Sequence, residues 1–93
     1  RFYHYVTCEP DHPHVLDYLD AARLVTGKAP RVCGGGLGDH SVMAKYGCPS
    51  ALTVGCIRSF EEEGGAHQPN EYMPCDKLVE FTKIVAAYIL KVL

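Results

Sequence analysis

The sequence lacks the marks of several classes of protein. It contains no tryptophan, and no apolar run in its 93 residues approaches the length of about 18 that a membrane-spanning helix needs. Nine Lys and Arg residues against 11 Asp and Glu residues give a formal charge of −2, without a basic cluster. We therefore expect no membrane span and no nucleic-acid partner, because nucleic-acid binding needs clustered positive charge.

The first residues also lack the form of a targeting segment. The chain opens with Arg-Phe-Tyr-His and has neither an initiating Met nor a basic stretch followed by an apolar one. We expect no secretory signal, and we interpret the sequence as a processed product or a piece of a longer chain. Its composition, 47% apolar and 22% charged, is that of one globular domain with a small core.

The cysteines lack the spacing of a zinc ribbon or a redox motif. There are five of them, no CxxC pair occurs, and a disulfide framework would leave one thiol over. We therefore expect free thiols in a reducing cytoplasm. Cys33, Cys48 and Cys56 flank apolar segments, so we expect these three in the core.

Periodic apolar residues predict an early and a late helix. The first is expected to be capped by Asp11 and to stop at Gly27, a left-handed C-cap. Its apolar face comprises Val15, Leu19, Ala22 and Val25. The late helix is expected over residues 75–93. Its apolar stripe comprises Leu78, Phe81, Val85, Ile89 and Val92.

Three other segments favour strands. Residues 2–7 are rich in aromatic and β-branched types, residues 31–33 are a short candidate, and residues 51–54 form an apolar run. With a short helix over residues 41–46, the order alternates strands and helices. This alternation predicts an α/β fold, a mainly parallel sheet with flanking helices. Residues 56–74 form a long irregular stretch, of a kind that is usually functional or disordered.

Four glycines in residues 34–38 precede the short helix. A glycine-rich loop at a helix start can bind an anion through its backbone N–H groups. It is not a P-loop, because no GK[ST] sequence follows, and the dinucleotide-binding spacing is also absent. A tight strand-to-helix turn with Asp39 as the helix cap is the simpler interpretation of this spacing.

His67 lies in a glycine-flanked, acid-rich part of the irregular stretch. A neutral imidazole there can be a zinc ligand, and a solvated loop histidine is the plainer alternative. A zinc site needs three or four protein ligands, and only Glu71 stands within four residues after His67. The residues alone leave both interpretations open. The acidic run 61–63 is most simply a solvated surface.

Four short segments, taken in order, carry a family resemblance. Residues 25–30 (VTGKAP) are similar to a VTGKEP sequence, and residues 34–39 (GGGLGD) resemble a GG-x-(S/T)-D turn. Residues 44–49 (AKYGCP) resemble AxxGIP, and residues 65–72 (GAHQPNEY) closely resemble a GAHxPNE motif. All four are found in this order in the M20 family of zinc metallopeptidases, which includes acetylornithine deacetylase, succinyl-diaminopimelate desuccinylase and several dipeptidases.

The resemblance implies roles for particular residues. His67 matches the family's last zinc ligand, and Asn70 and Glu71 match the residues that hold its loop. The resemblance also implies a set of residues that line the substrate pocket, with backbone N–H groups near a substrate carboxylate. These are Gly36, Gly38 and Asp39.

The resemblance further implies a domain organisation and an activity. Residues 1–8 would be the last strand of a lid or dimerisation domain, and residues 9–93 the C-terminal part of a larger zinc-peptidase catalytic domain. The complete cytoplasmic enzyme would bind two zinc ions, form a homodimer, and cleave a peptide or N-acyl amide bond in a peptide or N-acyl amino acid. The family's HxD motif, bridging Asp and Glu-Glu pair have no counterpart in this sequence. We therefore expect the segment to be inactive without the remainder of the enzyme chain.

Two other functions stay open at the level of sequence. One is a non-catalytic, truncated or excised α/β module that acts in binding or assembly. The other is a small α/β domain that binds an anion at the glycine loop. Zinc content separates the peptidase from both. Since a segment of a larger sheet exposes apolar faces, we also expect the isolated chain to be marginally stable or self-associating.

Overall fold

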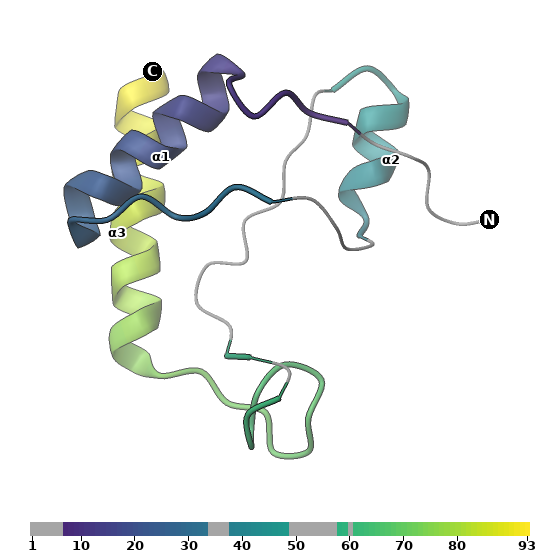
Figure 1. Cartoon of the computed structure of the whole chain (residues 1–93), viewed down its shortest axis with the longest axis vertical. Helices are drawn as coiled ribbons and strands as arrows, with labels where there is room; N and C mark the ends of the chain where they lie inside the picture. Colours follow the sequence, from purple (N-terminus) through teal and green to yellow (C-terminus); the bar gives the residue numbers. More distant parts are fainter. Residues whose placement is uncertain (1–6, 34–37, 49–57, 60) are drawn as a thin grey trace.

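The computed structural model describes residues 7–33, 38–48, 58–59 and 61–93 (Figure 1). Over these ranges the chain forms three helices, α1 (Pro13–Thr26), α2 (His40–Lys45) and α3 (Cys75–Val92). All three were predicted from the sequence, with bounds that agree to within a residue or two. The described part of the long irregular stretch contains turns but neither helix nor strand, as predicted.

The predicted parallel sheet is wrong for the described part of the chain, which is helical and contains no strand. Of the three expected strands, only residues 31–33 are fully described, and there Val32 is 46% exposed. β-Branched composition favours a strand only where a second backbone supplies hydrogen-bond partners, and the described ranges contain no second strand beside these residues. Thr7 also lies outside any strand, and residues 2–6 and 51–54 are not among the described residues.

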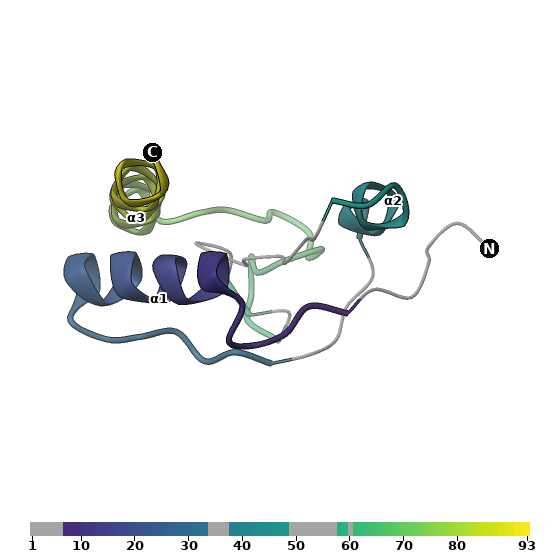
Figure 2. The ribbon, with the colours of Figure 1, turned by 90° about the horizontal axis from the view of Figure 1, so that it is seen from above.

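Helices α1 and α3 cross and pack on each other, and α2 lies to one side of this pair (Figure 2). The ring of Tyr18 meets that of Tyr88 edge to face, with 5.8 Å between their centroids. Lys91 Nζ lies 3.7 Å from Asp20 Oδ2. The buried apolar residues of the two helices are Ala21, Ala22 and Ile84. The core is therefore small and depends on one helix pair.

The ends of α1 correct one prediction and confirm another. His12, not Asp11, is the N-cap, because its Nδ1 accepts the backbone N–H of His14 at 3.2 Å and Pro13 occupies the first helical position. The imidazole nitrogen of His12 thus accepts the capping hydrogen bond that was expected of the Asp11 carboxylate. Gly27 is the left-handed C-cap, with φ 78°, and its N–H donates to the Arg23 carbonyl at 2.8 Å.

Because the core is small, part of the apolar stripe that was predicted to be buried is exposed. The stripe predicted for α3 is covered only in part: Ile84 is buried and Phe81 is half-buried, whereas Leu78 and Ile89 are each 47% exposed. Only α1 packs against α3 in the described chain, so only one side of the helix is covered.

The cysteines follow the same pattern. Cys33 and Cys48 are exposed rather than in the core, and Cys56 is not among the described residues. Both exposed thiols lie outside α1 and α3, the two helices whose contact forms the core. The four cysteines that the structure describes form no disulfide. No helix in the described ranges has both the length and the hydropathy needed to cross a membrane.

Candidate functional site

Residues 58–59 and 61–72, which we call the histidine loop, fold back on themselves ahead of α3 (Figure 1). The Ala66 N–H donates to the Arg58 carbonyl at 3.4 Å, and the Tyr72 N–H donates to the Gly64 carbonyl at 2.9 Å. Gly64, Gly65 and Ala66, which lie between these two hydrogen bonds, are buried. A Cβ atom at Gly65 would collide with the carbonyl of Ser59, so only glycine fits this position. The loop therefore has a defined shape without regular secondary structure.

The motif residues His67, Asn70 and Glu71 meet within this loop. Glu71 Oε2 accepts the backbone N–H of His67 at 3.2 Å, and the Glu71 N–H donates to the Gln68 carbonyl at 3.2 Å. His67 and Asn70 both have left-handed backbones, with φ of 61° and 59°. This conformation is uncommon for residues other than glycine, although asparagine, aspartate and histidine are enriched in it. The hydrogen bonds around the turn hold both residues in it.

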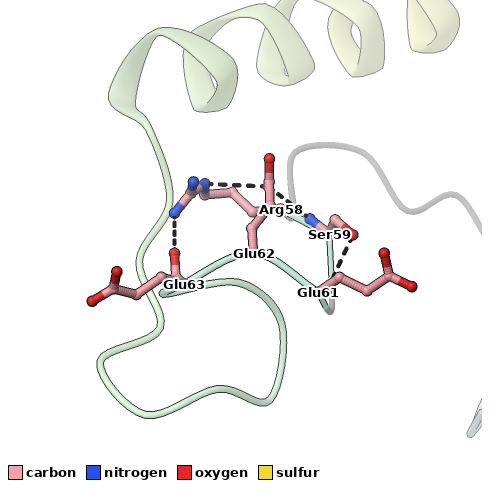
Figure 3. Close-up of polar contacts among 5 residues, drawn as sticks. All are labelled: Arg58, Ser59, Glu61, Glu62 and Glu63. Carbon is pink, nitrogen blue, oxygen red and sulfur yellow. Dashed lines mark hydrogen bonds and ion pairs between the residues drawn. The ribbon is translucent and has the colours of Figure 1, made fainter.

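Arg58 braces the loop from its other side (Figure 3). Its Nη1 donates to the Glu63 carbonyl at 2.6 Å, and its Nε lies 3.6 Å from Glu62 Oε2. The guanidinium carbon also lies 4.3 Å from the centre of the Tyr72 ring, a cation–π contact. One planar side chain, 22% exposed, thus ties the acidic run to the residue that follows the GAHxPNE motif.

The acidic run has a structural use beyond solvation. Residues 61–63 are exposed, as predicted, but the carboxylate of Glu62 also accepts the Ser59 N–H at 3.2 Å. The Glu61 N–H in turn donates to Ser59 Oγ at 3.3 Å (Figure 3). An open depression of about 520 Å³ lies over this part of the loop. It is lined by Arg58, Glu62, Glu63, Gly64, Asn70 and Tyr72.

The structure does not bring the predicted pocket residues next to His67. Gly38 and Asp39 lie just before α2, and α2 and the histidine loop are separate parts of the ribbon (Figure 1). Asp39 occupies the N-cap position, as predicted, but its side chain makes no capping hydrogen bond. Gly36 is not among the described residues. The expected substrate pocket is therefore not assembled within the described chain.

The donor set around His67 allows one zinc ligand rather than a complete site. Imidazole and carboxylate are both common zinc ligands, and His67 and Glu71 supply one of each. The Glu71 carboxylate, however, already accepts the His67 N–H. Within the described ranges no three His, Cys, Asp or Glu side chains are grouped closely enough to hold a metal ion. The exposed His67 fits as a single ligand, and the others have to come from elsewhere.

Sequence reasoning missed the roles of Arg58 and Tyr72. The spacing of Arg58 and Glu62, four residues apart, was one available signal of an ion pair. The stacking of Arg58 on Tyr72 joins residues 14 positions apart and follows only from the return of the loop. No short-range pattern encodes that contact.

Comparisons with known proteins add no relative. No family model, no curated protein and no solved structure matches this chain. The argument for function therefore depends on the residues of the histidine loop and on the order of the four sequence segments.

Proposed function

We propose that this chain is the C-terminal part of a co-catalytic zinc peptidase or amidohydrolase that cleaves a peptide or N-acyl amide bond. In this proposal His67 holds one of two zinc ions, and Asn70 and Glu71 hold the loop that presents it. Gly36, Gly38 and Asp39 contribute to binding the substrate once the remainder of the enzyme completes the pocket. Bound zinc would polarise the scissile carbonyl and activate a water molecule.

One observation carries most of the proposal: the hydrogen bond from the His67 N–H to the Glu71 carboxylate, across a turn with two left-handed residues. Backbone strain in non-glycine residues is concentrated at functional sites, where neighbouring groups hold it in place. Residues that orient a metal ligand are typically hydrogen-bonded carboxylates and carbonyls. In this turn the Glu71 carboxylate accepts the backbone N–H of His67, so it holds the loop that presents the imidazole. The turn occurs in the segment that most closely resembles the family.

The charge of the loop supports a cation nearby. The histidine loop contains four carboxylates, those of Glu61, Glu62, Glu63 and Glu71, and one guanidinium, that of Arg58, so it carries a net negative charge. Nearby carboxylates lower the free energy of a bound divalent cation. Arg58 pairs with Glu62 and so offsets only part of this charge.

The test is the zinc content of the protein purified from its natural source, measured together with hydrolysis of a panel of dipeptides and N-acyl amino acids. We expect about two zinc ions per polypeptide and turnover of at least one substrate class. His67→Ala should lose zinc and activity together. Glu71→Gln should retain the imidazole but bind zinc more weakly, by about 10- to 100-fold, because a neutral amide oxygen replaces the charged acceptor of the His67 N–H and accepts it more weakly.

Two matched control variants distinguish a loss of zinc that is specific to His67 and Glu71 from a general effect of substitution. His14→Ala removes an exposed histidine from α1, and Glu61→Gln removes a carboxylate from the histidine loop. Both variants should keep the zinc content of the unmodified protein. Absence of zinc from the natural protein, or retention of all zinc by His67→Ala, would contradict the proposal and favour a non-catalytic binding module.

A further inference from the structure

The start of α1 depends on one titratable side chain. His12 Nδ1 accepts the backbone N–H of His14 at 3.2 Å, and the first turn of the helix contains no acidic residue. Pro13, at the first helical position, has no N–H, so the His14 N–H is the first donor that the helix start has to satisfy. The side-chain cap of α1 is therefore a single hydrogen bond to an imidazole nitrogen.

This hydrogen bond requires a neutral imidazole in one of its two forms. A ring nitrogen that accepts a hydrogen bond carries no proton, so the proton of neutral His12 is on Nε2. An imidazolium has an N–H at both nitrogens and cannot accept a hydrogen bond. Free imidazole side chains change charge near about pH 6.5. Protonation of His12 therefore removes the cap, which an asparagine, serine or threonine in this position would retain.

The nearest charges act against an imidazolium at His12. The N-terminal end of a helix carries a partial positive charge, which repels a cation placed there. The rings of His12 and His14 lie 5.4 Å apart, centroid to centroid, so a second imidazolium would repel the first. The carboxylate in contact with this pair, that of Asp17, lies 4.0 Å from Nδ1 of His14. Protonation of His14 is thus partly compensated, whereas protonation of His12 is not.

The other charges near this end of the helix are weakly coupled to His12. Glu9 and Asp11 precede the cap, both are exposed, and within the described ranges neither forms an ion pair with His12. Exposed charges interact weakly in water, so they do not replace a lost hydrogen bond. Helix α3 packs on α1, and its ion pair with α1, from Lys91 to Asp20, lies eight residues beyond the cap.

The backbone of His12 joins two turns. Its N–H donates to the Glu9 carbonyl at 3.0 Å, and its carbonyl accepts the Leu16 N–H at 3.0 Å, the first hydrogen bond of the helix. Helix ends open at a lower free energy than the middle of a packed helix. A change at His12 therefore reaches both turns before it reaches the contact between Tyr18 and Tyr88.

We propose that the cap of α1 is a pH-sensitive switch: protonation of the His12 imidazole opens the first turn of α1 and the turn before it, while the rest of the helix stays packed on α3. Acidification thus changes the conformation of the chain where it enters the helix pair. This inference is independent of the proposed zinc chemistry, because His12 lies outside the histidine loop and the switch needs no metal.

The first test is nitrogen NMR spectroscopy of the His12 ring in the purified protein, together with hydrogen exchange at the His14 amide. At about pH 8 we expect a neutral ring with its proton on Nε2 and an amide that exchanges more slowly than in an unfolded chain. On acidification the amide should lose this protection at the pH at which His12 gains its second proton. A proton on Nδ1 of the neutral ring, or protection that does not change as His12 titrates, overturns the proposal.

A second test assigns the effect to His12 by urea denaturation. His12→Asn provides a capping oxygen that does not titrate, so this variant should fold at both pH values. The unfolding equilibrium constant of the unmodified protein, divided by that of His12→Asn, should rise about 5- to 30-fold between about pH 8 and pH 5. This ratio isolates His12, because the carboxylates that titrate over the same range are common to both proteins.

The matched control is His14→Ala. It removes the neighbouring imidazole but keeps the backbone N–H that the cap accepts, so the unmodified protein and this variant should show nearly the same dependence on pH. A ratio for His12→Asn that does not change with pH overturns the proposal. So does a change with pH that appears for His14→Ala and not for His12→Asn.

Discussion

At the scale of single residues, Arg58 determines the shape of the histidine loop. Its side chain contacts the acidic run, at Glu62 and Glu63, and also the ring of Tyr72. Its hydrogen bond to the Glu63 carbonyl is short, 2.6 Å, and carries a charge on the donor. Charged donors of this kind contribute more than neutral ones. The loop is therefore expected to loosen when this one residue is removed.

We predict that Arg58→Ala lowers the free energy of unfolding by about 1–3 kcal/mol, since a charged hydrogen bond and a cation–π contact are lost together. Arg58→Lys should recover less than half of this loss, because an ammonium group cannot reproduce the planar contacts. Urea denaturation measures the loss, and hydrogen exchange at the Ala66 and Tyr72 amides locates it in the loop.

The matched control is Arg23→Ala on α1. Arg23 also contacts a carboxylate, Asp20 at 3.1 Å, but its side chain is exposed. An exposed pair contributes about 0–1 kcal/mol, so this variant should lose little and leave loop exchange unchanged. Equal losses for the two arginines would show that Arg58 is only another surface charge.

The sequence alone could predict some of these contacts between residues and not others. His67, Asn70 and Glu71 stand within five positions of one another, so their meeting in one turn follows from local spacing. The contact between Arg58 and Tyr72 depends on a loop that returns on itself, and a linear pattern does not contain it. The choice of His12 over Asp11 as the cap of α1 depends on the position of Pro13, one residue further along.

At the scale of elements, the helix pair depends on one large aliphatic residue. Ile84 is the largest buried apolar side chain among the described residues, and the other three buried apolar residues are alanines. We predict that Ile84→Ala lowers the free energy of unfolding by about 2–4 kcal/mol, because the cavity lies where α1 and α3 meet. Urea denaturation followed by helical circular dichroism measures this change.

Two further variants, one conservative and one at the surface, serve as comparisons for Ile84→Ala. Ile84→Val should lose only about 0.5–1.5 kcal/mol, which keeps the comparison possible if Ile84→Ala does not fold. Leu24→Ala, at an exposed position of α1, should change stability by no more than about 0.5 kcal/mol. If Leu24→Ala proves as harmful as Ile84→Ala, the core is not at the α1–α3 contact.

The helices were predicted correctly and the sheet was not, because the two depend on contacts of different range. Each helix is encoded by contacts three and four residues apart, so the periodicities of α1 and α3 were sufficient to predict them. A sheet requires pairing between distant segments, and no described segment pairs with residues 31–33 as a strand. Among the described elements only α1 packs on α3, which explains why Leu78 and Ile89, predicted as core, are half exposed.

At the scale of the whole molecule, the chain is flat and open. Its radius of gyration is 14.5 Å, against about 12 Å for a compact domain of this length. Its principal extents are 37 × 36 × 19 Å. Such a shape buries little apolar surface per residue. Self-association of the isolated chain, which its exposed apolar residues favour, therefore adds burial.

Because association and folding are then linked, we predict that the melting temperature rises with protein concentration. A dimer that dissociates on unfolding gains stability by mass action. A 100-fold increase in concentration adds about 2.7 kcal/mol per mole of dimer, since each tenfold step is about 1.4 kcal/mol. For a domain near 93 residues this corresponds to several degrees. Calorimetry at two concentrations measures the shift, and Ile89→Glu, which places a charge at a 47% exposed apolar position of α3, should reduce it. A sharp melt at one temperature over that range would show that the monomer is stable by itself.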